Sequence, residues 1–224
     1  MTFSIAARCA ATGMFGLAVS SSSPAVAARC AFARAGVGAV ASQNITDPAL
    51  GPWILDLMAG GASAEEAIRQ VTAAAPHIDF RQLTAIDLAG RTAAFEGAKT
   101  LGVHAVAEGR DGVAAGNLLA NPDVPEAMVA IFQGAGGHLG DRLLTALQAG
   151  LAAGGEAGPV HSAGLLMVRE VAWPVADLRV DWHETDPIGA LAELWALYKP
   201  QLDDYVTRAL DPTRAPGYGV PGDP

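Results

Sequence analysis

Cysteine, aromatic residues and basic residues are all scarce in this chain. Its only cysteines are Cys9 and Cys30, too few for the disulfide scaffold of a small secreted domain. We predict that both cysteines act as small apolar side chains that fill space. A disulfide bridge or a reactive thiol is the alternative. The 14 Lys and Arg against 23 Asp and Glu give a net charge of −9. This balance argues against nucleic acid as a partner, because nucleic-acid binders need basic patches.

Long apolar runs are also missing. A membrane-spanning helix requires about 18 consecutive apolar residues, so we expect no membrane partner. Charged residues make up only 17% of the chain and hydrophobic ones 51%, which favours a large packed core over disorder. The length predicts one domain over residues 1–210, followed by a Pro/Gly-rich tail over residues 211–224.

The first 23 residues have two incompatible interpretations. A secretory signal peptide needs a continuous apolar stretch of about 7–15 residues, but Thr12, Gly13 and Gly16 interrupt it here. Residues 25–28 do resemble a small-residue cleavage site, so a secreted protein stays an alternative. We favour a structural role for this stretch and a cytoplasmic protein.

In the structural interpretation, the first 23 residues form a hairpin. Phe3 and Ile5 alternate with small or polar residues, the period of a strand. A second strand over residues 14–20 follows a turn that ends at Gly13. Pairing Cys9 with Met14 makes partner numbers add up to 23, which places the serines at 20–22 beside Thr2.

The remaining chain predicts strands in runs and helices in pairs. Residues 35–43 suggest a third strand, Asp47-Pro48 a helix start, and Ser63 with Glu66 a capping box. The predicted order is three strands, two helices, three strands, two helices, two strands and one or two helices. This is not βαβ alternation, so we predict an α+β fold: two antiparallel sheets packed face to face beneath helical layers.

Several motifs that would indicate a known chemistry are absent or lie in unsuitable structural surroundings. Residues 36–41 match the dinucleotide string but lie inside an apolar run that suggests a strand. No serine lies in a G-x-S-x-G turn, and the five histidines lack helical metal-ligand spacing. The acidic group at residues 181–186 is typical of a strand end followed by a helix N-cap. We therefore predict neither a cofactor nor a metal.

Thr2 can supply chemistry only under one condition. A threonine hydroxyl is a poor nucleophile until a base takes its proton. Removal of Met1 would give Thr2 a free α-amino group, whose pKa of about 7.7–8.0 suits that role. Asn44 and Asn117 could supply oxyanion donors. The pair His161-Ser162, before a buried strand, is either an ordinary loop pair or a polar lining of the site.

Longer stretches resemble a bacterial family of unknown function that is grouped with the N-terminal nucleophile (Ntn) hydrolases. They include the opening MTFSIAAR…GLAVSSSSPAVAARCAFARAGVGAVASQNITDP and, further on, RQLTAIDLAGRTAAF, AAGNLLANP, PVHSAGLLMV, DLRVDWHETDPIGAL and PQLDDYVTRALDP. They occur in order along nearly the whole chain. The resemblance implies a four-layer α/β/β/α sandwich and hydrolysis of a small non-peptide amide.

Matched position by position, the resemblance implies Thr2 as nucleophile and places Ser21, Asn117 and Ser162 at positions typical of the family. One departure is that Cys9-Ala10 stands where relatives usually carry Asp-Pro. The alternative is a non-catalytic small-molecule-binding protein that retains the fold. The apolar composition and the tail suggest a homodimer.

Overall fold

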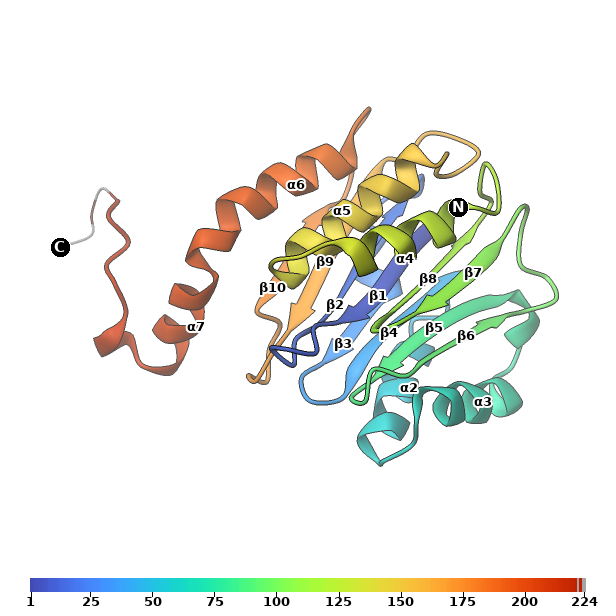
Figure 1. The fold of residues 1–224 in the computed structure, drawn as a ribbon, viewed down its shortest axis with the longest axis horizontal. Coiled ribbons are helices and arrows are strands. Elements are labelled where there is room, and N and C mark those ends of the chain that lie inside the picture. Colours follow the sequence, from blue (N-terminus) through green and yellow to red (C-terminus); the bar gives the residue numbers. More distant parts are fainter. Residues whose placement is uncertain (221, 223–224) are drawn as a thin grey trace.

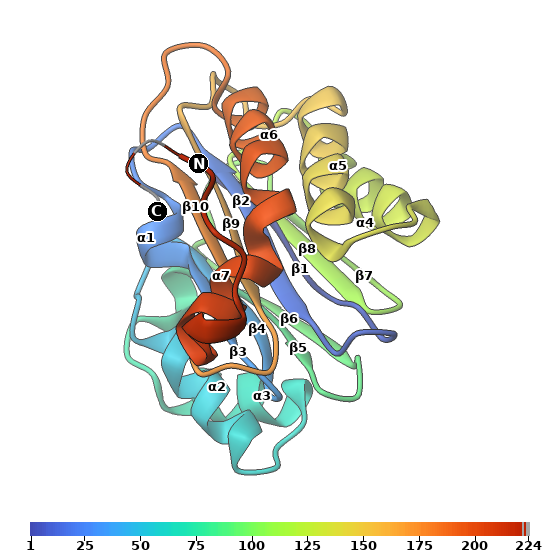
Figure 2. The ribbon, with the colours of Figure 1, turned by 90° about the vertical axis from the view of Figure 1, so that its left-hand side faces the viewer.

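The computed structural model describes residues 1–220 and residue 222. Two antiparallel sheets pack face to face, and helices cover the outer face of each sheet (Figures 1 and 2). The predicted α+β class and its α/β/β/α layers are therefore confirmed. Of the predicted tail, residues 221, 223 and 224 lie outside the described residues.

Sheet A has six strands in the order β10–β9–β2–β1–β8–β7, so the first two strands of the chain lie at its centre. Its members are β1 (Thr2–Arg8), β2 (Phe15–Ser21), β7 (Ala105–Gly109), β8 (Gly112–Asn117), β9 (Ser162–Val168) and β10 (Ala176–Val180). The helices on its outer face are α4 (Val124–Gly134), α5 (Leu139–Ala152) and α6 (Pro187–Tyr198).

Sheet B has four strands in the order β3–β4–β5–β6. They are β3 (Ala31–Arg34), β4 (Gly38–Asn44), β5 (Arg81–Asp87) and β6 (Thr92–Glu96). Helices α2 (Leu50–Ala59) and α3 (Ala64–Ala74) cover its outer face, and a 3₁₀ turn (Ile78–Phe80) leads into β5. The short helix α1 (Ala27–Cys30) contacts β4 of sheet B and β9 of sheet A.

The C-terminal segment extends away from the two sheets (Figure 1). After α6 come a 3₁₀ turn (Lys199–Gln201), α7 (Leu202–Leu210) and a second 3₁₀ turn (Pro212–Arg214). The tail folds back on α7, because the Arg208 guanidinium lies 4.0 Å from the Tyr218 ring centre and donates to the Pro216 carbonyl at 3.0 Å.

Three apolar clusters correspond to the three spaces between the layers. Phe3 and Ile5 point from β1 toward α4 and α5, whereas Ala6 points toward sheet B. Because side chains alternate along a strand, Thr2 and Ser4 share the face of Ala6. Gly164 allows α1 to approach β9, since a Cβ there would lie 2.3 Å from the Ala27 Cβ.

The hairpin prediction is confirmed. Phe3 pairs with Ser20 and Arg8 with Phe15, so partner numbers add up to 23, and Thr2 lies opposite Ser21. The capping box is confirmed as well, since Ser63 Oγ accepts from the Glu66 N–H at 3.2 Å and Glu66 Oε2 accepts from the Ser63 N–H at 2.8 Å.

Three predictions of elements were wrong. The expected strand over residues 35–43 is β4, which begins only at Gly38 because the chain turns at Gly36 (φ +69°), and β3, which precedes this turn, was not predicted. Strand β7 was not predicted. Helix α2 begins at Leu50 rather than beside Asp47, although Asp47 Oδ1 still accepts from the Ala49 N–H at 3.0 Å.

The structure bears on two further questions from the sequence. Cys9 and Cys30 are both free thiols, so the bridge considered for them does not form. Among residues 1–220 and 222, no helix is long and apolar enough to cross a membrane. The stretch that resembles a signal peptide forms β1 and β2.

Candidate active site

Four polar side chains gather at one end of the central strands of sheet A. Thr2 on β1 pairs with Asn117 on β8, and Ser21 on β2 pairs with Ser162 on β9. The hairpin register places Thr2 next to Ser21. All four face sheet B, Thr2 is only 5% exposed, and the other three are fully buried. The antiparallel register therefore assembles residues from distant parts of the chain.

Hydrogen bonds link the hydroxyl groups of this cluster. Thr2 Oγ1 donates to the Met1 carbonyl oxygen and lies 3.5 Å from Ser21 Oγ. Ser21 Oγ also donates to the Met1 carbonyl, at 2.5 Å, and lies 2.8 Å from Ser23 Oγ. Arg29 donates to Ser23 Oγ at 2.6 Å. Two hydroxyl groups thus converge on the Met1 carbonyl oxygen. The Arg29 guanidinium lies beyond them, at the Ser23 hydroxyl.

Ser162 stabilises the loop after β2. Its hydroxyl donates to the Ser23 carbonyl at 2.6 Å and accepts from the Val26 N–H at 3.3 Å. The side chain is thus occupied with loop backbone, which positions Ser21 and Ser23 for their contacts.

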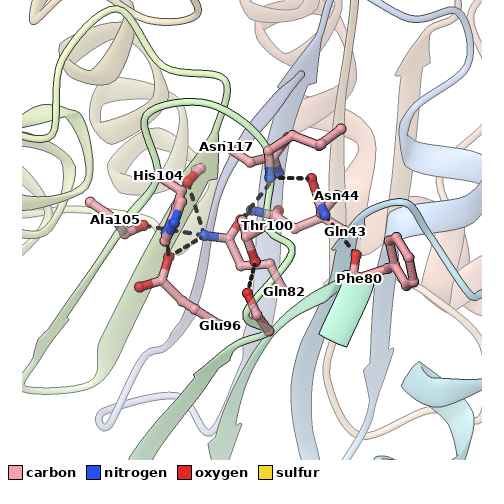
Figure 3. Close-up of polar contacts among 12 residues, drawn as sticks. Gln43, Asn44, Phe80, Gln82, Glu96, Thr100, His104, Ala105 and Asn117 are labelled. Atoms are coloured by element: carbon pink, nitrogen blue, oxygen red, sulfur yellow. Dashed lines mark hydrogen bonds and ion pairs between the residues drawn. The ribbon is translucent and has the colours of Figure 1, made fainter. Parts of the chain in front are cut away.

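Asn117 belongs to a polar network between the sheets (Figure 3). Its amide donates to Gln82 Oε1 at 3.1 Å, and Gln43 donates to the same oxygen at 2.7 Å. Gln43 Oε1 in turn accepts from Ser4 Oγ at 2.7 Å. Among the described residues, no hydrogen-bond donor reaches the side-chain oxygen of Asn117, which is buried. The network fixes the strand ends of the two sheets against each other.

Asn44 is not held by the hydroxyl cluster. Its amide donates to the Phe80 carbonyl at 2.6 Å, and its side-chain oxygen accepts from the Leu101 N–H at 3.3 Å. Its backbone is left-handed, with φ 75°. Asn44 therefore fastens the end of β4 to two loops, and its amide is occupied as a donor.

His161 lies on the other face of sheet A. Its backbone N–H donates to the Ser21 carbonyl at 2.8 Å, but its ring stacks on Trp182 with centres 4.4 Å apart. Its Nδ1 lies 3.0 Å from the His183 carbonyl oxygen. The His161 ring is thus held by Trp182 and by the His183 backbone, at the start of β9.

Glu156 is a site residue that sequence reasoning missed. It is 5% exposed, and its two carboxylate oxygens accept from the Ser22 N–H at 3.2 and 3.1 Å. Burial raises its pKa to about 7, against the opposing influence of the chain's positive amino terminus, Ser22 and His161. The only signal in the sequence is one acid directly after two glycines, in Gly154-Gly155-Glu156.

The Cys9-Ala10 departure lies far from this cluster. Cys9 follows the last residue of β1, whereas Thr2 is the first, and a seven-residue strand spans about 23 Å. The missing Asp-Pro therefore removes no group from the neighbourhood of Thr2.

No metal site accompanies the hydroxyl groups. Within the part of the chain that the structure describes, no three His, Cys, Asp or Glu side chains are grouped as metal ligands. Asp186, in the acidic stretch, accepts from the Gly189 N–H at 2.8 Å and so caps α6. The chemistry available here is that of hydroxyl groups, amides and one buried carboxylate.

Comparison with known proteins identifies the family. The model of a family of unknown function, DUF1028, matches residues 2–191. The chain belongs to this family. Protein SPO2555 from Silicibacter pomeroyi, a solved DUF1028 structure, is 32% identical with a TM-score of 0.83, covering 88% of this chain and 89% of that one. Anbu (ancestral beta-subunit) from Yersinia bercovieri is 11% identical with a TM-score of 0.39, covering 97% and 100%. No curated protein matches the chain.

Proposed function

We propose that this DUF1028 protein is an Ntn-type amidohydrolase that cleaves a small amide, with Thr2 as nucleophile after removal of Met1. The observation that carries the proposal is the convergence of Thr2 Oγ1 and Ser21 Oγ on one carbonyl oxygen. Both hydroxyl groups donate to that oxygen, so the site holds a carbonyl group beside the Thr2 hydroxyl with Ser21 as a donor to its oxygen, as acyl transfer needs.

The free amino group of Thr2 acts as the base. It takes the hydroxyl proton while Oγ1 attacks the carbonyl carbon of the amide, and Ser21 Oγ donates to the oxyanion that forms. The carbon–nitrogen bond then breaks, and the leaving amine takes the proton from the Thr2 ammonium. An ester on Thr2 remains.

Water completes the reaction. The Thr2 amine takes one proton from water, the hydroxide oxygen adds to the ester carbonyl, and the ester bond breaks. Thr2 Oγ1 recovers the proton from the ammonium. The sum is an amide and water giving a carboxylic acid and an amine, and the protein returns to its starting state without a cofactor.

The deciding experiment combines mass and activity. Intact-mass measurement establishes whether Met1 is removed, and the Met1-free protein is screened on small amides. We expect amidase activity that Thr2→Ala abolishes and Thr2→Ser partly retains. A purified native protein that fully keeps Met1 would contradict the Thr2 mechanism.

The second candidate is a small-molecule-binding protein without catalysis. Met1, where it is kept, acylates the Thr2 nitrogen and leaves no free amine, which favours this role for the unprocessed chain. Binding of a small molecule that Thr2→Ala leaves unchanged would support it. A homodimer and a cytoplasmic location remain predictions.

A further inference from the structure

Met1 occupies the space in front of Thr2 in the manner of an aminoacyl group. Its carbonyl oxygen accepts from Thr2 Oγ1 and Ser21 Oγ. Met1 itself is 38% exposed, whereas Thr2 is buried. The space that Met1 fills therefore connects the buried hydroxyl groups with solvent.

The amino group of Met1 lies within electrostatic range of one buried carboxylate. Glu156 accepts from the Ser22 N–H with both oxygens, and no Lys or Arg of the described chain forms an ion pair with it. The positive charge of the amino terminus acts on this carboxylate. A buried carboxylate is costly without a cationic partner, and among the described residues neither a basic side chain nor the amino terminus forms an ion pair with Glu156. A ligand that brings a positive charge to Glu156, beside Ser22, would supply this partner.

The side chain of Met1 borders a glycine. A Cβ built on Gly158 would lie 3.6 Å from Met1 Cε, which is ordinary contact. A methyl group thus fits at this position, but a branched side chain would enter the space of the Met1 side chain. Gly158 sets the depth available to a side chain there.

We infer that the space left by Met1 takes an amide whose acyl part carries a free α-amino group, such as an amino acid amide. This inference rests on the proposed function and names its substrate class. Glu156 receives the ammonium, Ser21 Oγ donates to the carbonyl oxygen, and Gly158 borders the side chain. The products of cleavage are then a free amino acid and an amine.

Binding tests the inference separately from catalysis. The probe protein is Thr2→Ala without Met1, confirmed by intact mass, and calorimetry compares L-methioninamide with N-acetyl-L-methioninamide. We expect methioninamide to bind at least about ten-fold more tightly, because acetylation removes the charge that Glu156 receives. Glu156→Gln should abolish this difference. Equal binding of the two amides, or no binding of methioninamide, would overturn the inference.

Two matched controls locate the ligand. The same protein that retains Met1 should bind neither amide, because Met1 already fills the space. Gly158→Val should weaken the binding of methioninamide about ten-fold and leave the binding of glycinamide unchanged. Unaltered methioninamide binding in either control would place the ligand elsewhere and overturn the inference.

Failure of the inference and failure of the proposed function give different results. Thr2-dependent hydrolysis of N-acylated amides, without methioninamide binding, would keep the function and overturn the substrate class. Methioninamide binding that Glu156→Gln weakens, without any Thr2-dependent hydrolysis, would support the recognition and contradict the hydrolase.

Discussion

The two ends of strand β1 differ in how their reactive groups are held. At the far end, an open hollow of about 430 Å³ is lined in part by Arg8, Cys9, Arg110 and Arg142. Although burial raises it, hydrogen bonding with Thr12 brings the pKa of the Cys9 thiol below its usual value. At the near end, Thr2 is buried, with its hydroxyl on a carbonyl oxygen. The far end carries a thiol whose pKa is lowered, whereas at the near end two hydroxyl groups converge on one carbonyl oxygen.

Replacing each of the two candidate nucleophiles should give the largest difference in activity between the two ends of β1. Thr2→Ala in the Met1-free protein should lower amidase kcat/KM by at least about 10³-fold, because the variant lacks the hydroxyl group that forms the ester. Cys9→Ala should change it less than about two-fold. Steady-state kinetics on the best amide from the screen measures both. A large loss in Cys9→Ala would move the chemistry to the other end of the strand.

Within the near end, comparing Ser21 with Ser162 tests which hydroxyl group acts in catalysis and which acts only in structure. Ser21→Ala should lower kcat/KM by about 10²-fold, the usual loss for one oxyanion donor. Ser162→Ala should leave kcat/KM within a few-fold and cost about 1 kcal/mol of stability, because its hydroxyl contacts loop backbone. Kinetics and urea unfolding of both variants test this, and equal kinetic losses would contradict it.

Glu156 gives the near end a pH dependence. Its pKa is about 7 in the folded protein against 4.5 for the ordinary carboxyl group, so the folded state binds the extra proton between these values. The free energy of unfolding should therefore fall as pH rises from 4.5 to about 7, by up to about 3 kcal/mol. Glu156→Gln should flatten this fall, measured by urea unfolding across the window.

The exposed Glu184, which accepts from Trp182 Nε1 at 2.8 Å, provides the matched control. Glu184→Gln should leave the pH dependence of the wild-type protein intact. Parallel curves for wild type and Glu156→Gln would show that Glu156 does not titrate in this window.

The smallest effect is expected at the far end. Arg142 lies 4.0 Å above the centre of the Phe132 ring and donates to the Phe132 carbonyl at 3.1 Å. Arg142→Ala should cost about 1 kcal/mol of stability through these contacts. It should leave amidase kcat/KM unchanged. A kinetic effect would show that the two ends are coupled along β1.

Local signals were enough for the hairpin and its register. The turn before Met14 and the period of two place Ser21 opposite Thr2, as the structure has it. Longer-range features were out of reach. β7 (Ala105–Gly109) is only half-buried and lacks alternation, and the turn at Gly36 lies between small apolar residues that continue the pattern of a strand.

Side-chain roles were harder to predict than positions. The orientation of Asn44 depends on Phe80 and Leu101, which lie far along the chain. Glu156 joins the site because the loop after α5 passes beside the Ser22 N–H. Neither contact has a local sequence pattern, since both form only when the layers pack.

The central place of β1 has a practical consequence for any fusion protein. A tag joined to the amino end would leave through the space of Met1 and deny Thr2 its free amine. Residues 211–220 lie on the opposite side of the molecule (Figure 1). Purification handles and fluorescent labels therefore belong at the carboxyl end, and under the proposed mechanism an assay on an amino-tagged preparation would report an inactive protein.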